Sequence, residues 1–532
     1  MVRDDQTAAL VLTLFAVGAF GLMLSACVAS DRLVRKDTPA RSAPSVGMAR
    51  APGQPPAPAP DIRTPGPSPD RLPVVPPPRA EAAEVPEGYR VEVVLSDLLF
   101  PSSVEFDDEG AMYVAECGEP AGSPARVLKY SSAEPSQEKP EVVAAGLVAP
   151  VTDLLWHEGR LYISHRGKIS VLERGALHDL ITGLPSAGDH VNNQMSLGPD
   201  GMLYVGQGTA TNSGVVGVDN FMFGWLQAHP DFCDVPAHDV TLTGASFESV
   251  DPLAALTGGA TRTVRTSPFQ PFGHTVPAGT VVKGSERATG TILRARLDGR
   301  DLGVYAWGLR NPFGVAWGPD GKLYAAEGGA DERGSRPIAN CPDALWRLEE
   351  GSFCGWPDYA AGVPVTDERY RPAQGPAPQL VMQEHPPVAQ PLITLPPHSS
   401  VTGIAFSTNP NFGFEGQLFV GASGDNAPVT AAAQERAGFW VQRVDTSTGK
   451  LEMFFRARPD SLGARDEEYV TTPGPKRPVD VRFSRDGSAL YVVDYGPVLW
   501  VRSATGPAPR YFPGTGVLWR ITRDLQVPQS PR

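Results

Sequence analysis

One pattern recurs along the chain and constrains its fold more than any other feature. An apolar strand, a turn that contains an acidic residue and a glycine, and a second apolar strand occur together six times. This is a hairpin signal, because glycine adopts the positive φ that a tight turn requires. Self-similar units of this kind indicate a repeat architecture. The six turn glycines are Gly110, Gly159, Gly201, Gly321, Gly416 and Gly487.

Further strand-like runs follow several of these hairpins, and they set the size of each unit. They are "KISVLER" (168–174), "GTILRARLDG" (290–299), "GFWVQRVD" (438–445) and "GVLWRITR" (516–523). Four short antiparallel strands in each of six units predict an all-β fold, a six-bladed β-propeller over residues 89–525. A pair of β-sandwiches would explain the strand content but not six copies of one hairpin. The 56 glycines and 55 prolines are spread along the chain, which agrees with many turns.

The longest interval between turn glycines lies between the third and fourth repeats. Residues 215–286 contain no clear repeat, so we expect an insertion there. Two interpretations stay open for it, a lid over one face of the propeller and a surface loop without a role at the site.

The N-terminal region indicates export. Residues 8–27 form an apolar run just long enough to span a bilayer, which takes about 20 residues. Its end, "LSAC", resembles the lipobox of bacterial lipoproteins, so we predict a lipoprotein-type signal peptide over residues 1–27 with Cys27 as the lipidation site. An uncleaved signal anchor is the alternative. Either one predicts an extracytoplasmic protein, in the periplasm or at the cell surface, that is tethered to the membrane.

A proline-rich stretch separates this signal from the propeller. Residues 28–88 include "APGQPPAPAPDIRTPGPSPDRLPVVPPPRA", which predicts an extended, disordered linker. Residues 526–532 are expected to form a short tail. The net charge of -13, without a cluster of basic residues, argues against nucleic acid or an anionic membrane surface as a partner. Contact with the membrane is therefore expected only through the N-terminal lipid or anchor.

Four cysteines remain if Cys27 is lipidated. An even number in an oxidising compartment makes two disulfides plausible. Spacing makes Cys341 with Cys354 the simplest pair and leaves Cys117 with Cys233, although four cysteines allow three pairings. Buried free thiols are the alternative interpretation.

Polar residues gather at the ends of the repeated strands, where the loops of a propeller converge on its central channel. "GDHVNNQ" carries Asp189 and His190 just before the third repeat, and "GQGTATNSG" carries Gln207 and Asn212 after it. The fourth repeat places Arg310 and Asn311 before its first strand and "EGGADERG" (327–334) after its second.

These residue types suit an oxidation. A histidine held in the right tautomer is a general base for an alcohol or lactol, and an arginine suits a carboxylate or quinone oxygen. Glu327, Asp331 and Glu332, with glycines between them, form an oxygen-rich loop of the kind that Ca²⁺ favours. The plainer interpretations are a loop histidine bonded to backbone, a salt bridge between blades and a solvated acidic loop.

The order of these motifs resembles the glucose/sorbosone dehydrogenase family, which are quinoprotein sugar dehydrogenases on six-bladed propellers. The resemblance is carried by "DH" with "NNQMSLGPDGMLYVGQGTATN", by "VYAWGLRNPFGVAWGPDGKLYAAEGGADE" and by "PDALWRLEEGSFCGWPDYAAG". "HSSVTGIAF" and "KRPVDVRFSRDGSALYVVDYG" are similar to the last two blades, especially in the sorbosone-type branch. The match runs from residue 86 to residue 523 except for the insertion.

This resemblance implies a small sugar substrate, pyrroloquinoline quinone (PQQ) with bound Ca²⁺ as cofactors, and an external electron acceptor. In the family pattern His190 is the general base and Asp189 its neighbour. The remaining matches are cofactor contacts at Arg310, Asn311, Gln207, Asn212 and Arg477, and the calcium loop, with the backbone carbonyls of Gly329 and Ala330 flanked by Glu327 and Asp331.

Some positions depart from the family pattern. The loop after Gln207 lacks an arginine, "GASGDNAP" lacks a lysine that many members place against the quinone, and a second arginine of the last blade is replaced near Val479. Each charged hydrogen bond is worth about 1.5–3 kcal/mol, so the lost cations weaken the expected binding. Two other functions therefore stay open, a non-catalytic propeller that binds glycan or protein, and a hydrolase of the propeller lactonase type.

Overall fold

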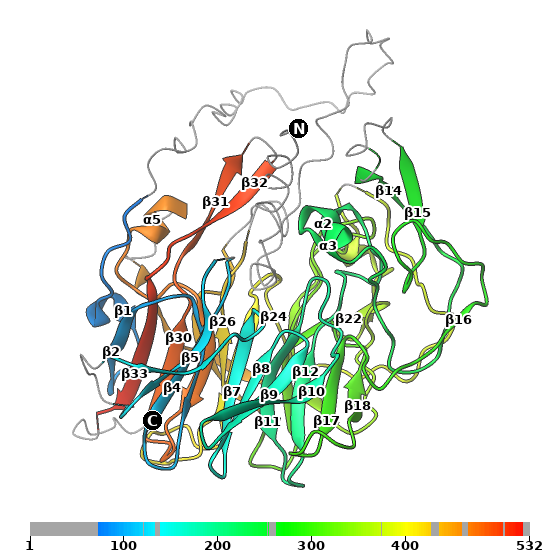
Figure 1. Cartoon of the computed structure of the whole chain (residues 1–532). Coiled ribbons are helices and arrows are strands. Elements are labelled where there is room, and N and C mark those ends of the chain that lie inside the picture. The colour runs from blue at the N-terminus through cyan, green and yellow to red at the C-terminus, as the bar shows by residue number, and fades with distance from the viewer. Residues whose placement is uncertain are drawn as a thin grey trace, which may run out of the picture.

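The chain folds into a six-bladed β-propeller, as its repeats predict (Figure 1). The structure is a computed structural model and describes residues 73–120, 122–133, 139–252, 254, 262–373, 375–426, 436–459, 466–503 and 506–524. The predicted signal peptide with Cys27, most of the predicted linker and the predicted tail lie outside these residues. Within the described part of the chain, no helix is long and apolar enough to cross a bilayer.

Each blade is an antiparallel sheet that contains one of the predicted hairpins as its two inner strands. Blade one is β3 (Pro101–Phe106), β4 (Met112–Cys117), β5 (Ala125–Tyr130) and β6 (Glu141–Ala145). Blade two is β7 (Val151–His157), β8 (Arg160–His165), β9 (Lys168–Glu173) and β10 (Ala176–Thr182). Blade three is β11 (Asn192–Leu197), β12 (Leu203–Gln207), β17 (Thr291–Ala295) and β18 (Gly303–Trp307).

The second half of the ring repeats this order. Blade four is β19 (Asn311–Trp317), β20 (Leu323–Gly328), β21 (Asp343–Leu348) and β24 (Ile393–Leu395). Blade five is β25 (Val401–Phe406), β26 (Leu418–Ala422), β27 (Trp440–Asp445) and β28 (Lys450–Ala457). Blade six is β29 (Pro478–Phe483), β30 (Ala489–Asp494), β33 (Gly516–Arg523) and β2 (Tyr89–Leu98). Because β2 comes from the start of the described chain, blade six closes the ring.

The hairpin turns are built as the sequence predicts. All six turn glycines have a positive φ, between 69° at Gly487 and 87° at Gly110. In three of the hairpins an aspartate of the turn also accepts a hydrogen bond from a tyrosine on the second strand, as Asp320 does from Tyr324 at 2.9 Å. The turn residues therefore also fix the aromatic side chain that packs between blades.

The core consists of six apolar clusters, one between each pair of neighbouring blades. Leu161 and Ile163 of β8, for example, pack against Tyr113 and Ala115 of β4. The second strand of each hairpin is therefore buried on both faces, which explains sequences with few polar residues such as LYAAEG in β20 and ALYVVD in β30. Burial of this kind contributes about 25 cal/mol per Å² of apolar surface.

The insertion lies inside blade three, between its second and third strands, and not between two blades. It holds α2 (Val218–Met222), α3 (Trp225–Ala228) and two short sheets, β13 (Val240–Thr241) with β16 (Val281–Val282) and β14 (Phe247–Val250) with β15 (Thr263–Thr266). It rises from the same end of the propeller as the hairpin β31 (Val498–Ser503) and β32 (Gly506–Tyr511) and as α5 (Asp466–Val470) (Figure 1).

Blade four contains a second insertion, which the repeat pattern does not predict. Between β21 and β24 lie β22 (Tyr359–Ala360), β23 (Val363–Pro364) and the short 3-10 helix η2 (Glu368–Tyr370). Asp358, just before β22, is fully buried. It accepts hydrogen bonds from the side chains of Arg336 and His385 and from the backbone N–H groups of residues 381 and 382. Satisfying one buried carboxylate in this way fixes the loop on the blade.

The last part of the predicted linker is ordered, which corrects its expected end at residue 88. The 3-10 helix η1 (Ala80–Ala82) leads into β1 (Ala83–Glu84), which pairs antiparallel with the outer strand of blade five. The backbone N–H of Arg79 also donates to the Pro473 carbonyl at 3.0 Å. These backbone groups find partners on the propeller, so this segment joins blades five and six.

The predicted disulfides do not form. All four cysteines of the described residues are free thiols. Cys341 and Cys354 pack in different apolar clusters, Cys117 belongs to the core between blades six and one, and Cys233 lies in the insertion. The alternative of buried free thiols therefore describes Cys117, Cys341 and Cys354, with Cys233 partly buried.

A buried polar network joins the innermost strands at the propeller axis. Ser103 Oγ lies 3.0 Å from Asp153 Oδ1 and 3.0 Å from Asp480 Oδ2, which links blades one, two and six. Gln194 Oε1 accepts hydrogen bonds from the backbone N–H groups of Val315 and Ile404 at 2.9 and 3.2 Å, which links blades three, four and five. The axis is therefore closed by side chains that bond across blades.

One guanidinium balances the carboxylates of this network. Arg482 Nη2 lies 2.7 Å from Asp153 and 3.6 Å from Asp480, and its Nη1 lies 3.6 Å from Glu105. Burial raises the pKa of all three carboxyl groups against the opposing effect of Arg482, and that of Asp153 reaches about 7.

We expect Arg482→Met to lower the free energy of unfolding by about 3–5 kcal/mol at pH 8, because it leaves buried carboxylates without their cation. The loss should shrink at pH 5, where these groups take up protons more readily. Urea unfolding followed by tryptophan fluorescence at both pH values measures it. Arg485→Met is the matched control, since Arg485 pairs with Asp108 at the exposed surface and should contribute little. Equal effects of the two substitutions would contradict a structural role for the axial network.

Candidate functional site

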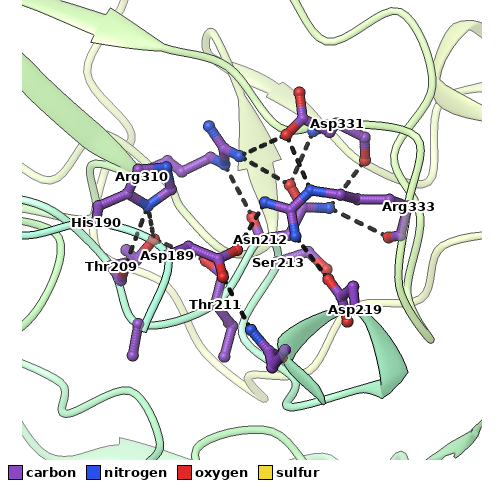
Figure 2. A network of polar contacts seen from close by, with 12 residues as sticks. Asp189, His190, Thr209, Thr211, Asn212, Ser213, Asp219, Arg310, Asp331 and Arg333 are labelled. Atoms are coloured by element: carbon purple, nitrogen blue, oxygen red, sulfur yellow. Dashed lines mark hydrogen bonds and ion pairs between the residues drawn. The ribbon is translucent and has the colours of Figure 1, made fainter. Parts of the chain in front are cut away.

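The predicted site residues of blades three and four meet at the end of the propeller that carries the insertion (Figure 2). His190 and Asp189 precede β11, Asn212 follows β12, Arg310 precedes β19 and Asp331 follows β20. Strand ends of neighbouring blades lie side by side, so loops more than 100 residues apart in sequence are in contact there.

His190 is buried and held in one tautomer. Its Nδ1 lies 3.1 Å from the carbonyl oxygen of Thr209, which only accepts hydrogen bonds, so Nδ1 carries the proton. Among the described residues no hydrogen-bond partner faces Nε2. Burial, with Arg310 and Arg333 nearby, holds the pKa of His190 well below its ordinary value. The imidazole is therefore neutral at neutral pH, with a lone pair free on Nε2.

Asp189 does not contact the imidazole of its neighbour. The side chain is fully buried, with Oδ1 accepting a hydrogen bond from Asn220 at 2.9 Å and Oδ2 accepting one from Arg333 at 2.6 Å. Burial raises the pKa of this carboxyl group, and Arg333 works against that rise. The tautomer of His190 is thus fixed by Thr209, while Asp189, predicted as the neighbour of the base, bonds to Asn220 and Arg333.

Arg310 is predicted to contact the cofactor, and the protein already uses most of its N–H groups. Nη2 lies 3.0 Å from both Asn212 Oδ1 and Asp331 Oδ2, and Nε donates to the Asn212 carbonyl at 3.2 Å. Nη1 donates to the Gly328 carbonyl at 3.3 Å. One Nη1 hydrogen remains for a ligand.

Asn212 and Asp331 form a close pair that fixes this arginine. The Asn212 amide donates to the Asp331 carbonyl at 2.8 Å, and the Asp331 backbone N–H donates to Asn212 Oδ1 at 2.8 Å. Burial works to raise the pKa of Asp331, but Arg310, His398 and Arg333 outweigh it and lower that pKa far below its ordinary value. Asp331 is therefore an ionised partner of Arg310 and Arg333, with the His398 imidazole also beside it.

The predicted calcium loop is only partly available to a metal. Both oxygens of Glu327 are used, one by the backbone N–H of Arg310 and the other by the Trp346 indole at 2.6 Å, and burial raises the pKa of Glu327 to about 7. Asp331 is bound to cations, as described above. No group of three or more His, Cys, Asp or Glu side chains within the described ranges is placed to hold a metal. Glu327 and Asp331 are therefore not free metal ligands here.

The two backbone carbonyls of that loop behave differently. Gly329 donates its N–H to Asp343 at 2.9 Å, and a Cβ at this position would come within 2.4 Å of the Pro342 carbonyl, so only glycine fits. Within the described chain, neither the Gly329 nor the Ala330 carbonyl oxygen accepts a hydrogen bond. Both oxygens are therefore without a partner among the described residues and could accept a ligand.

Three other predicted residues lie outside the charged network. Asn311 accepts a hydrogen bond from Asn193 at 2.9 Å, and Gln207 donates to the Pro185 carbonyl at 2.7 Å while its buried Oε1 has no partner among the described residues. Arg477 donates to the carbonyls of Ser423 and two following residues of blade five, at 2.9 to 3.2 Å. Its Nε is buried and, in the described part of the chain, unpartnered.

Sequence reasoning missed three charged members of the site. Arg333 contacts Asp189, Asp219 and Asp331, and His398 Nδ1 lies 3.3 Å from Asp331. Burial lowers the pKa of His398, but the contact with Asp331 outweighs it and raises the net value. Asp219 comes from the insertion, which contains no repeat signal. Arg333 is part of the motif "EGGADERG", but nothing in the sequence of an acidic loop indicates that its arginine is buried.

These groups fit an anionic cofactor that also binds a cation. The orphaned Nε of Arg477 and the remaining Nη1 hydrogen of Arg310 are donors, and the carbonyls of Gly329 and Ala330 are acceptors. The donor set is smaller than the family pattern implies, because the lysine and the second arginine are absent from the sequence.

Comparisons with known proteins agree with this fold. Residues 288–444, less than half of the chain, match the sequence profile of the family described as Glucose / Sorbosone dehydrogenase. The structure is similar to the holo form of the pyranose dehydrogenase PQQ domain from Coprinopsis cinerea, with 15% identity over 85% of this chain and 99% of that one and a TM-score of 0.50. At this identity the likeness shows the fold alone.

Two further solved structures have lower scores. PQQ-bound aldose sugar dehydrogenase from Streptomyces coelicolor is 15% identical over 82% of this chain and 99% of that one, with a TM-score of 0.44. Soluble aldose sugar dehydrogenase from Escherichia coli, in its apo form, is 14% identical over 82% and 99%, with a TM-score of 0.45. No curated protein sequence matches the chain.

The loop that orients His190 is itself anchored by a buried carboxyl group of the insertion. Asp234 accepts hydrogen bonds from the Ala210 N–H at 2.7 Å, from Thr211 at 2.5 Å and from Thr289 at 3.0 Å. Burial raises the pKa of Asp234 to about 7. The folded protein therefore holds this proton at pH values where the unfolded chain, with a pKa of about 3.9, has lost it.

We expect this group to lower the free energy of unfolding as pH rises from about 4 to about 7, with no further change above. Asp234→Asn removes the titration, so the variant should lose less stability over that range than the wild type. Urea unfolding from pH 4 to 8 measures the difference, with the exposed Asp231→Asn as control. Parallel curves for wild type and Asp234→Asn would show that Asp234 does not titrate in this range.

Proposed function

We propose that the protein oxidises an aldose or a related sugar by transferring hydride to PQQ, as a member of the glucose/sorbosone dehydrogenase family. The observation that carries the proposal is His190, a neutral imidazole with Nδ1 fixed on Thr209 and Nε2 unpartnered within the described chain, close enough to Arg310 for that cation to lower its pKa. The family match of residues 288–444 supports it. The similarity of the last two blades favours the sorbosone-type branch.

The chain's own residues would prepare the sugar for oxidation. Nε2 of His190 accepts the proton from the anomeric hydroxyl, and the low pKa of the imidazole keeps this nitrogen unprotonated before the reaction. Two nearby guanidinium groups oppose a lasting positive charge on His190, so the proton should leave to solvent after each turnover. The insertion covers the side of the site formed by Val191 and Ala210, where Trp225 and Leu226 pack, and so excludes water there.

PQQ, when bound, supplies the hydride acceptor, with Ca²⁺ polarising its quinone oxygens. Arg310 and Arg477 would hold it through their remaining N–H groups, and the carbonyls of Gly329 and Ala330 would bind the cation. Electrons would leave to an external acceptor. We also propose an extracytoplasmic location, with the N-terminal signal and Cys27 as the membrane tether, because the sequence motifs there indicate it.

A second function is favoured by a specific observation. Arg310 is mostly occupied by Asn212 and Asp331, and two cations of the family pattern are missing, so the charge available to a tricarboxylate is reduced. A non-catalytic propeller that binds glycan or protein is therefore the competing proposal. The lactonase-type hydrolase is less supported, since the described residues contain no cluster of carboxylate ligands for its metal.

Titration calorimetry of the full-length protein with PQQ separates these functions. We expect binding at micromolar Kd or tighter, about -8 kcal/mol or more favourable, and only with Ca²⁺ present. Arg477→Gln should weaken it by roughly 10- to 150-fold, because one charged hydrogen bond is worth about 1.5–3 kcal/mol. An absence of binding with and without Ca²⁺ would leave the binding propeller as the function.

His190→Gln tests the base directly. We expect kcat with an artificial electron acceptor to fall by about 10²–10⁴-fold while PQQ affinity is retained. In the wild type the acid limb of kcat/KM should lie below the ordinary histidine pKa, because burial lowers the pKa of His190. His178→Gln, at an exposed position on the outer strand of blade two, is the control. Full turnover in His190→Gln with bound PQQ would show that another group is the base.

A further inference from the structure

Arg333 is a fully enclosed charge at the site, and each part of its guanidinium faces a different carboxylate (Figure 2). Nη2 donates to Asp189 at 2.6 Å, Nη1 to Asp219 at 2.7 Å and Nε to Asp331 at 3.1 Å. The side chain has 0% exposure. A planar fork with donors in fixed directions can bind three separate partners in this way, whereas an ammonium group is a single point charge.

The three carboxylates belong to three parts of the molecule. Asp189 directly precedes His190 in the loop before β11. Asp331 Oδ2 also lies 3.0 Å from Nη2 of Arg310. Asp219 belongs to α2 of the insertion. One side chain thus joins the loop of the proposed base, the partner of the cofactor-facing arginine, and the segment that covers both.

We propose that Arg333 is a positioning residue that holds the His190 loop and the Arg310 guanidinium in register, and that docking of the insertion completes this arrangement. The inference rests on the proposed function, in which His190 and Arg310 act together. It assigns a role to a residue of the acidic loop that touches neither the sugar nor PQQ.

The packing around Arg333 shows that the insertion is part of the arrangement. The Phe223 ring of the insertion lies 5.3 Å from the guanidinium carbon. Gly334 has a φ of +78°, and a Cβ there would come within 2.8 Å of Asp219 Oδ2. Glycine therefore allows the acidic loop to approach α2 of the insertion closely. Burial raises the pKa of Asp219 to about 6 although Arg333 lowers it. Without the guanidinium, Asp189 and Asp219 would be two buried carboxyl groups that interact unfavourably and have lost the cation they share.

Arg336, three residues further on, provides a matched control. It is equally enclosed and pairs with Asp358 at 2.9 Å, and its other N–H groups donate to carbonyls of Ser213, Pro357 and Gln379. Its charge is therefore held with similar completeness, but it contacts neither Asp189 nor Asp331. A purely structural contribution of a buried arginine should appear in both positions.

The experiment compares Arg333→Lys and Arg336→Lys in the full-length protein. The readouts are the NMR signal of the His190 imidazole, assigned with His190→Gln, hydrogen exchange of residues 186–192 and 217–223, and kcat and KM with an artificial acceptor. For Arg333→Lys we expect a shifted His190 signal, faster exchange in both segments, and a kcat lowered by about 10- to 100-fold with KM little changed. Arg336→Lys should lower the midpoint of thermal unfolding and leave the His190 signal and kcat unchanged.

A folded Arg333→Lys whose His190 signal and kcat match the wild type would overturn the proposal and leave Arg333 as a structural latch. If Arg333→Lys does not fold, Asp189→Asn decides: a shifted His190 signal supports the proposal, and an unchanged one overturns it. The NMR and exchange readouts need no cofactor. If the wild type binds no PQQ, the proposed function fails on its own, while these two readouts still test Arg333.

Discussion

The apolar contact between the faces of neighbouring blades is the interaction on which the rest of the structure depends. Each inner hairpin is buried on both sides, so six similar sheets must close into a ring before any of them is covered. Closure draws the strand ends together at the axis, where backbone and polar side chains lose contact with water. The bonds of Ser103, Asp153, Gln194 and Asp480 across blades follow from this, because buried polar groups must find partners.

The candidate site extends the same logic to the end of the ring. There the loops of blades three and four bring together Arg310, Arg333, Asp189 and Asp331. The insertion adds Asp219, and all five side chains are buried. Isolated buried charges are costly, and their mutual pairing offsets that cost only when the geometry is good. The short contacts of Arg333 and the two hydrogen bonds between Asn212 and Asp331 meet that condition. The result is a network of paired buried charges, and His190 lies close to its two arginines.

The fold was predictable because each repeat carries its own local signal. The turn glycines, the alternating apolar strands and the third strands such as 438–445 are all where the sequence places them. The insertion was located by residue number but not by blade, since its position inside blade three depends on which later strand pairs with β12. The ordered segment at residues 79–84 was missed because proline-rich composition says nothing about an open strand edge elsewhere. The disulfides were wrong because even numbers and spacing do not report distance in space.

At the site, too, the sequence pattern does not report which side chains are in contact. These contacts determine which groups are left for a cofactor. Motifs identified His190, Arg310 and Asn212 as residues of one site, but they could not show that the partners of Asp189 are Asn220 and Arg333. This sequence lacks the lysine and the second arginine of the family pattern. Arg333 does not replace them, because three carboxylates already neutralise its charge. A charge matched at hydrogen-bond distance exerts little field beyond its partners. Recognition of an anionic ligand would therefore depend on the few donors left over, the Nε and one Nη2 N–H of Arg477 and one N–H of Arg310, together with any cation bound by the carbonyls of Gly329 and Ala330.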